Sequence, residues 1–132
     1  MIIQDFYIPK YDWYVTVYYN TTCEDTKKIL FHLNLLDCEE STIIKIGEKL
    51  KVCKPNTGMT YTSYNLKQSI IVISETTGFD EFLNTLTHEN MHLSIHIMEY
   101  LGQDLTGEPP CYLMGYITQA QANIIKHYIC KH

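Results

Sequence analysis

The sequence has no arginine, and its ten lysines are scattered or stand beside acidic residues rather than forming a basic cluster. Fifteen Asp and Glu residues outnumber them, so the formal net charge is −5 at pH 7. Proteins that bind nucleic acid concentrate Lys and Arg on one face to neutralise phosphates. The composition therefore argues against nucleic acid as a partner.

A targeting segment and a long apolar run are also missing. Residues 1–5 lack the basic and apolar regions of a signal peptide, and no stretch is apolar over the length that spans a bilayer. The cysteines are odd in number and contain no C-x-x-C pair: Cys23, Cys38, Cys53, Cys111 and Cys130. We therefore expect a cytoplasmic protein with reduced, buried thiols and no membrane partner.

Linker-forming residues are scarce, with only six glycines and four prolines in 132 residues. No proline- or glycine-rich linker and no internal repeat divides the chain, which is long enough for one hydrophobic core. We predict a single domain over residues 1–132. The many Ile, Asn, Lys and Tyr residues and only two alanines are typical of an AT-rich genome, which suits a phage, prophage or mobile element.

The most informative motif is H-E-x-x-H, formed by His88, Glu89 and His92. Two histidines four residues apart lie on one face of a helix, where both imidazoles can bind one metal ion. In zinc-dependent peptidases, zinc bound in this way lowers the pKa of a water, and the glutamate accepts its proton as general base. We predict that His88 and His92 bind Zn²⁺ and that Glu89 is the base.

The segments around the motif match such a site. Residues 59–64 and 69–74 are β-branched and aromatic runs on either side of a turn, which predicts a hairpin. Residues 79–101 have helical periodicity, with Thr77 or Gly78 as the N-cap and Gly102 just after the last turn. We further expect that strand 69–74 can offer its edge to an extended peptide.

A catalytic zinc needs a third protein ligand, and several residues are candidates. His96 and Glu99 continue the same straight helix, and His96 lies about 12 Å along the axis from His88. One ion cannot bridge that distance, and Glu99 has the same problem. The glycine and third histidine of metzincins are replaced by Ile95 and Met98. These positions therefore exclude the metzincin arrangement.

Glu108 is the preferred third ligand, because a return helix over about residues 109–128, after a short loop, can bring it back to the histidines. Asp104, His96 and Cys111 remain alternatives. Tyr112 lies one turn after Glu108, and its phenol could donate a hydrogen bond to a developing oxyanion, although an ordinary packing role explains it equally well.

The order of elements predicts an α+β fold: a strand over residues 13–19, helices over 22–36 and 41–50, the hairpin, the H-E-x-x-H helix and the return helix. We expect a small three-stranded antiparallel sheet packed on helices that include the H-E-x-x-H helix.

The chain resembles a family of small zinc metallopeptidases of bacterial and bacteriophage genomes. The resemblance covers residues 13–19, the hairpin from Gly58, residues 82–93 around the motif, and residues 107–115. It implies a minimal, gluzincin-like zincin fold with His88, His92 and Glu108 on the metal and Glu89 as the base. Relatives are richer in basic residues around the hairpin turn, whereas this chain has no arginine at all.

These observations predict a zinc-dependent hydrolase, a small cytosolic peptidase acting on a peptide or protein. The alternative from a different class is a phage or mobile-element binding protein in which the zinc is structural. A hydrolase of a non-peptide substrate is the third reading. The intact Glu89 favours the two enzymes, because a purely structural metal site needs no base.

Overall fold

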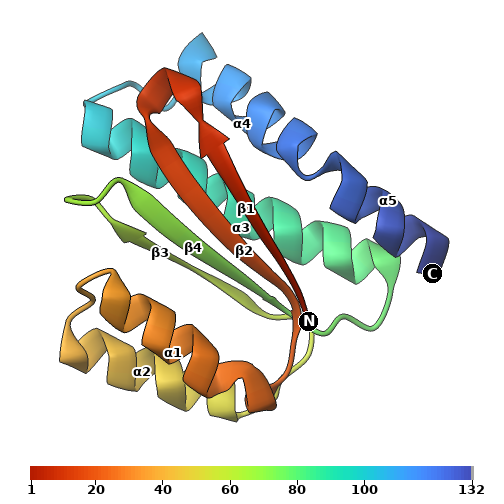
Figure 1. The fold of residues 1–132 in the computed structure, drawn as a ribbon. Helices are drawn as coiled ribbons and strands as arrows, with labels where there is room; N and C mark the ends of the chain where they lie inside the picture. The colour runs from red at the N-terminus through yellow and green to blue at the C-terminus, as the bar shows by residue number, and fades with distance from the viewer. Residues whose placement is uncertain (132) are drawn as a thin grey trace.

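The computed structural model describes residues 1–131 and shows a mixed sheet covered by helices on both faces (Figure 1). In chain order the elements are β1 (Ile2–Ile8), η1 (Pro9–Tyr11), β2 (Trp13–Thr21), η2 (Cys23–Asp25), α1 (Thr26–Leu35), α2 (Glu40–Lys51), β3 (Gly58–Ser63), β4 (Gln68–Ser74), α3 (Phe79–Leu101), α4 (Glu108–Ala120) and α5 (Ala122–Lys131). The fold is therefore α+β, as predicted.

The sheet has four strands in the order β1-β2-β4-β3, so the predicted three-stranded antiparallel sheet is wrong in number and in direction. β1 was missed because Gln4 interrupts its buried side, while Ile3 and Tyr7 are exposed on the other. β2 and β4 are parallel because the chain crosses over through α1 and α2 to the far edge before β4 returns to the centre. The other two pairings are antiparallel.

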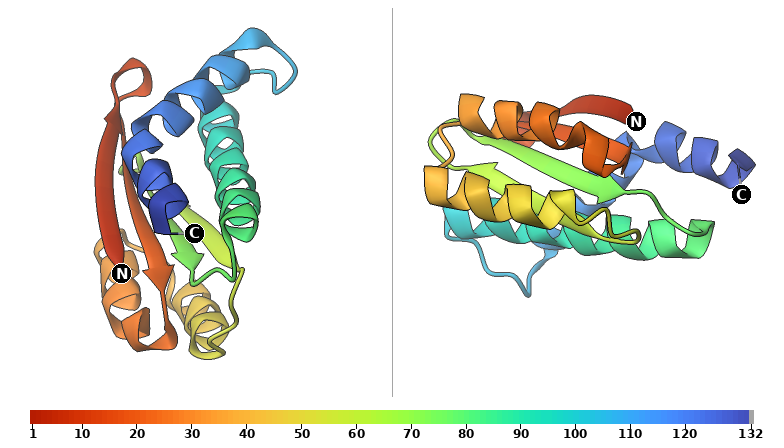
Figure 2. Two further views of the ribbon diagram at one scale, coloured as in Figure 1. Left: turned by 90° about the vertical axis from the view of Figure 1, so that its right-hand side faces the viewer. Right: turned by 90° about the horizontal axis from the view of Figure 1, so that it is seen from below.

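Helices lie on both faces of the sheet (Figure 2), and each face has its own hydrophobic core. The helices α3, α4 and α5 cover the face that we call the α3 face; α1 and α2 cover the face that we call the α1/α2 face. Buried residues on the α3 face include Trp13, Val15, Val17, Ile71, Ile73, Phe82, Leu93 and Ile97. Those on the α1/α2 face include Tyr18, Ile29, Leu33, Met59, Ile70 and Val72.

The H-E-x-x-H helix, α3, has the predicted limits, Phe79–Leu101. Gly78 is its N-cap, two acidic residues in the first turn favour the helix dipole, and Gly102 follows the last turn with φ of 67°. The predicted return helix is instead two helices, α4 and α5, which meet at Gln121. The Gln121 side chain is buried and exchanges two hydrogen bonds with Asn90 of α3, at 2.7 and 2.9 Å. This amide pair joins the α4–α5 junction to the middle of α3.

The cysteines differ from the expectation of reduced, buried thiols. Cys23 and Cys53 form a disulfide, because the turn after α2 passes η2 and brings their Cα atoms within 4.9 Å. Of the remaining three, only Cys38 is buried, whereas Cys111 and Cys130 are exposed. Within residues 1–131, no helix combines the length and apolar character needed to cross a membrane.

Candidate metal centre

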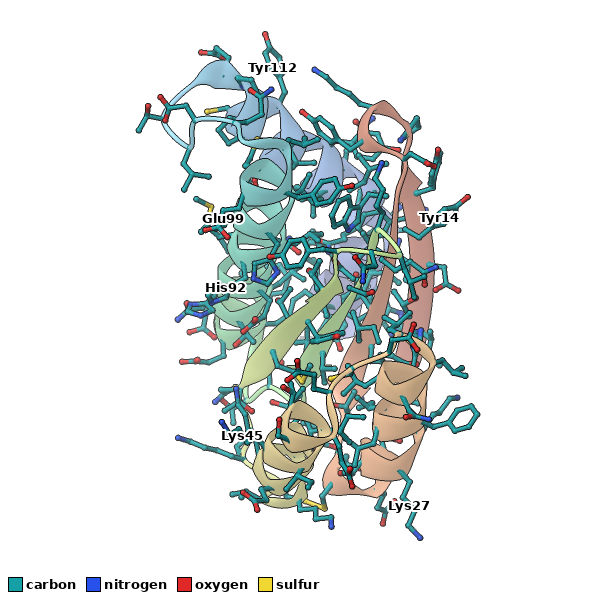
Figure 3. The ribbon with its side chains drawn as sticks, turned by 90° about the vertical axis from the view of Figure 1, so that its left-hand side faces the viewer. Tyr14, Lys27, Lys45, His92, Glu99 and Tyr112 are labelled. Carbon is teal, nitrogen blue, oxygen red and sulfur yellow. A yellow bond between two sulfur atoms is a disulfide. The ribbon has the colours of Figure 1, made fainter. Side chains whose placement is uncertain are left out.

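His88 and His92 face solvent from successive turns of α3 (Figure 3 labels His92). Their ring centroids are 4.8 Å apart, and the two Nε2 atoms approach to 3.2 Å. Zinc–nitrogen bonds of about 2.0–2.1 Å at a tetrahedral angle place two ligand nitrogens roughly 3.3 Å apart. The spacing and the imidazole donors therefore fit two ligands of one zinc ion.

The Glu89 side chain points in a different direction, into the space between α3 and β3. It is only 5% exposed. The Thr60 hydroxyl lies 2.9 Å from Glu89 Oε1 and 3.1 Å from the backbone oxygen of the same residue. Thr60 therefore holds one carboxylate oxygen against β3, and Oε2 has no such partner in the described part of the chain.

Gly58, the first residue of β3, is what allows Glu89 to lie there. A Cβ atom at Gly58 would lie 2.8 Å from Glu89 Cγ, 3.0 Å from Oε2 and 2.8 Å from the backbone oxygen of Val72. The last contact is with the neighbouring strand, which cannot move away without breaking the ladder. The absence of a side chain at Gly58 is therefore a steric requirement of the site.

One turn beyond His92, His96 is half-buried on the same side of α3 as Glu89. Its Nδ1 lies 2.8 Å from the Thr62 hydroxyl, which is 2.7 Å from the Ser69 hydroxyl. The Trp13 indole donates to Ser69 at 2.9 Å. Burial lowers the pKa of His96, and the neighbouring His92 lowers it further, so the neutral imidazole is favoured.

The edge of the sheet beside this site is β3 and not the predicted strand 69–74. β4 contains that strand and pairs with β2 on one side and β3 on the other, so it has no free edge. Immediately before β3, the Ser74 N–H donates a backbone hydrogen bond to the Thr57 oxygen, so the backbone groups of Thr57 face β4. Antiparallel pairing alternates, so Gly58, Thr60 and Thr62 direct their backbone groups outward. Lys49 Nζ donates to the Gly58 oxygen at 2.9 Å, as this alternation requires.

The structure does not bring Glu108 to the two histidines. Gln121, at the end of α4, is the residue that lies against Asn90, and Glu108 is at the start of α4. Thirteen helical residues correspond to about 20 Å, so Glu108 lies beside the far end of α3. Among residues 1–131, no three His, Cys, Asp or Glu side chains are grouped in a way that could hold a metal ion.

Tyr112 and two of the alternative ligands, Asp104 and Cys111, also lie apart from the histidines. Tyr112 is 71% exposed and lines a hollow with Ile8 and Tyr11, at a level of the molecule well beyond His92 (Figure 3). Asp104 accepts hydrogen bonds from the backbone and hydroxyl of Thr106, which lower its pKa. Cys111 is exposed on α4, and its thiol contacts the Gly107 oxygen at 3.6 Å.

Sequence reasoning missed the residues of β3 that contact α3. Gly58, Thr60 and Thr62 are spaced by two, so they share one face of the strand. Two of them are polar on a face that the predicted hairpin would bury, and a buried polar group needs a partner. This alternation of polar residues was the signal in the sequence that the face has polar partners. The partners are Glu89 for Thr60 and His96 for Thr62.

No protein-family model, curated protein sequence or solved structure gives a significant match to this chain. The family resemblance therefore stays a prediction, and the functional argument depends on the geometry of α3 and β3.

Proposed function

We propose that this protein is a zinc-dependent hydrolase, a small peptidase with a minimal zincin-like fold. The observation that carries the proposal is the arrangement of the motif: two Nε2 atoms 3.2 Å apart, with the intervening Glu89 buried against the free edge strand. A chance match to the motif would not require a glycine next to its glutamate. Here the missing side chain of Gly58 leaves the space that Glu89 occupies.

His88 and His92 would hold the zinc, which supplies Lewis acidity toward water and a carbonyl oxygen. Glu89 would accept a proton through Oε2, because Thr60 already occupies Oε1. In the hydrolysis, the water oxygen bonds to the carbonyl carbon and the C–N bond breaks. The proton held by Glu89 passes to the leaving nitrogen, which departs as an amine.

The outward backbone groups of Thr60 and Thr62 suit an extended peptide. Such a peptide would add to β3 as a further strand, with hydrogen bonds to these groups. Around the histidines, Leu83, Met91 and Ile95 form an apolar border on α3. These side chains favour a substrate with an apolar residue near the bond that is cleaved.

Metal analysis together with a peptide-library screen tests the proposal. The purified protein should take up zinc and cleave a peptide, His88→Ala should lose zinc, and Glu89→Gln should retain zinc but lose cleavage. The matched control is His127→Ala on α5, which should keep both zinc binding and cleavage. A wild-type protein that takes up no zinc, or a Glu89→Gln variant that still cleaves, would contradict the proposal.

The second candidate is a binding protein with a structural zinc. It is favoured by one observation: within the described residues only two side chains are placed to bind the ion, and they lie on an exposed, partly apolar helix face. A partner could then supply the missing ligands. Zinc at half an ion per chain, with a doubled mass in solution only when zinc is present, would favour this candidate over the peptidase.

A further inference from the structure

A chain of hydrogen bonds runs through the interior from β2 to α3 and ends at His96. It consists of the Trp13 indole, the Ser69 and Thr62 hydroxyls and His96 Nδ1, with successive distances of 2.9, 2.7 and 2.8 Å. Trp13 is fully buried, Ser69 is 2% exposed and Thr62 is 8% exposed. Water therefore has little access to the inner members of the chain.

The direction of the protons in this chain follows from its first member. An indole N–H can only donate, so Ser69 accepts from Trp13 and must donate its own proton elsewhere. Thr62 is the acceptor in reach, and Thr62 in turn donates to His96 Nδ1. The reverse direction would leave the Ser69 proton buried without an acceptor, which costs about 1–3 kcal/mol. His96 is therefore neutral, with Nδ1 as acceptor and the proton on Nε2.

The Nε2 side of the ring faces away from the sheet. Nδ1 is bonded to the interior, and the ring is only half-buried, so the Nε2 side is the one near solvent. The neighbouring rings are His92 and Tyr64, whose centroids are each 6.2 Å from that of His96. Tyr64 follows β3, and Thr62 beneath the ring belongs to the open edge. A donor therefore lies beside the backbone groups that would pair with a peptide.

We infer that His96 is a substrate-binding residue, whose Nε2–H donates to a carbonyl oxygen of a peptide paired with β3, and that Thr62 and Ser69 are positioning residues that orient it. The inference rests on the proposed peptidase function. It also gives His96 a different role from that of metal ligand, because a protonated Nε2 has no lone pair to offer a metal.

The first experiment measures the His96 tautomer in the zinc-free full-length protein by long-range ¹H–¹⁵N correlation NMR. The proton should be on Nε2. Thr62→Val has nearly the same shape but no hydroxyl, and it should abolish the single tautomer. Thr62→Ser restores the hydroxyl and should restore the tautomer. A proton on Nδ1 in the wild type, or the same tautomer in Thr62→Val, would overturn the inference.

The second experiment measures peptide affinity in the zinc-loaded Glu89→Gln protein, which should bind without cleaving. The probe is the peptide that the wild type cleaves fastest from a random library. Adding His96→Phe, which keeps a ring but removes the donor, should raise the Kd about tenfold, as expected for one lost hydrogen bond. Thr62→Val should raise the Kd in the same direction, and Thr62→Ser should not. His127→Phe is the control and should leave the Kd unchanged.

The two proposals fail in different ways. If the wild type cleaves the peptide and His96→Phe binds it as tightly as the parent protein, the inference is wrong and the peptidase function stands. If the wild type cleaves no peptide in the library and takes up no zinc, the proposed function fails and the inference fails with it.

Discussion

Each face of the sheet holds a half-buried histidine whose Nδ1 meets a hydroxyl group. On the α1/α2 face, His32 of α1 lies 2.7 Å from the hydroxyl of Tyr18, whose ring is itself part of the hydrophobic core. On the α3 face, His96 lies 2.8 Å from Thr62, whose hydroxyl continues to Ser69 and Trp13. The first histidine therefore completes a packed core, whereas the second is the end of a polar chain that leads to the open edge.

The edge strand β3 shows the same difference within six residues. Toward α1 and α2 it presents Met59 and Tyr61, which pack in the hydrophobic core. Toward α3 it presents Gly58, Thr60 and Thr62, which make room for Glu89 or hydrogen-bond to Glu89 and His96. Apolar packing gives more stability than small polar residues do, so the α3 side of β3 gives up stability to hold the polar side chains of Glu89 and His96.

The largest expected effect separates packing from metal binding. Leu33 in α1 and Leu93 in α3 are both fully buried, one on each face. Either leucine changed to alanine should lower the free energy of unfolding by about 2–5 kcal/mol, because each leaves a cavity. Only Leu93→Ala should also weaken zinc binding, since it loosens the helix that carries both histidines. Urea unfolding and zinc titration measure the two effects, and equal zinc affinities in the two variants would contradict the division between the faces.

Gly58→Ala should have the next largest effect. The added Cβ meets the backbone of β4 and the side chain of Glu89, and overpacking of this kind costs about 1–3 kcal/mol. The control is Gly115→Ala in α4, where nothing lies within 4 Å of the new atom. That change should be neutral or stabilising by up to about 1 kcal/mol, because alanine favours a helix more than glycine does. Thermal unfolding of both variants measures the difference, and a Gly58→Ala protein as stable as the wild type would contradict the steric requirement for glycine at this position.

The limits of prediction from this sequence are physical. α3 was predicted correctly because its periodicity, its first-turn acids and Gly102 are local signals. The hairpin was also predicted, but the parallel pairing of β2 with β4 depends on a crossover that no local pattern records. The placement of Glu108 depends on how far α4 extends beside α3. The Asn90–Gln121 pair sets that register, and two amides 31 residues apart gave no signal that they would meet.

A smaller effect concerns acid stability, to which both faces should contribute. Burial lowers the pKa of His32 and of His96 below the ordinary value of 6.5. Well above pH 6.5 both histidines are neutral in the folded and unfolded chains, so their contribution is constant. As the pH falls below that value, the unfolded chain binds protons that the folded chain does not, and stability decreases.

Substituting either histidine by phenylalanine should therefore reduce the loss of stability between about pH 7 and pH 5, measured by urea unfolding at several pH values. The two reductions should add, because the residues lie on opposite faces of the sheet and share no partner. A His32→Phe protein with an unchanged pH dependence would show that the two histidines are not equivalent in burial.

The smallest expected effect is that of Glu108→Ala on zinc affinity. Glu108 lies about 20 Å along α4 from the level of Asn90, so its removal should change the Kd for zinc by less than about twofold. If Glu108 is the third ligand, as the sequence predicts, the same change should weaken zinc binding by roughly 10–100-fold. Isothermal titration with zinc distinguishes the two results, with His92→Ala as the control for loss of a ligand. A large loss in Glu108→Ala would mean that zinc binding moves the start of α4 toward the histidines, and that the polar side of β3 is only part of the site.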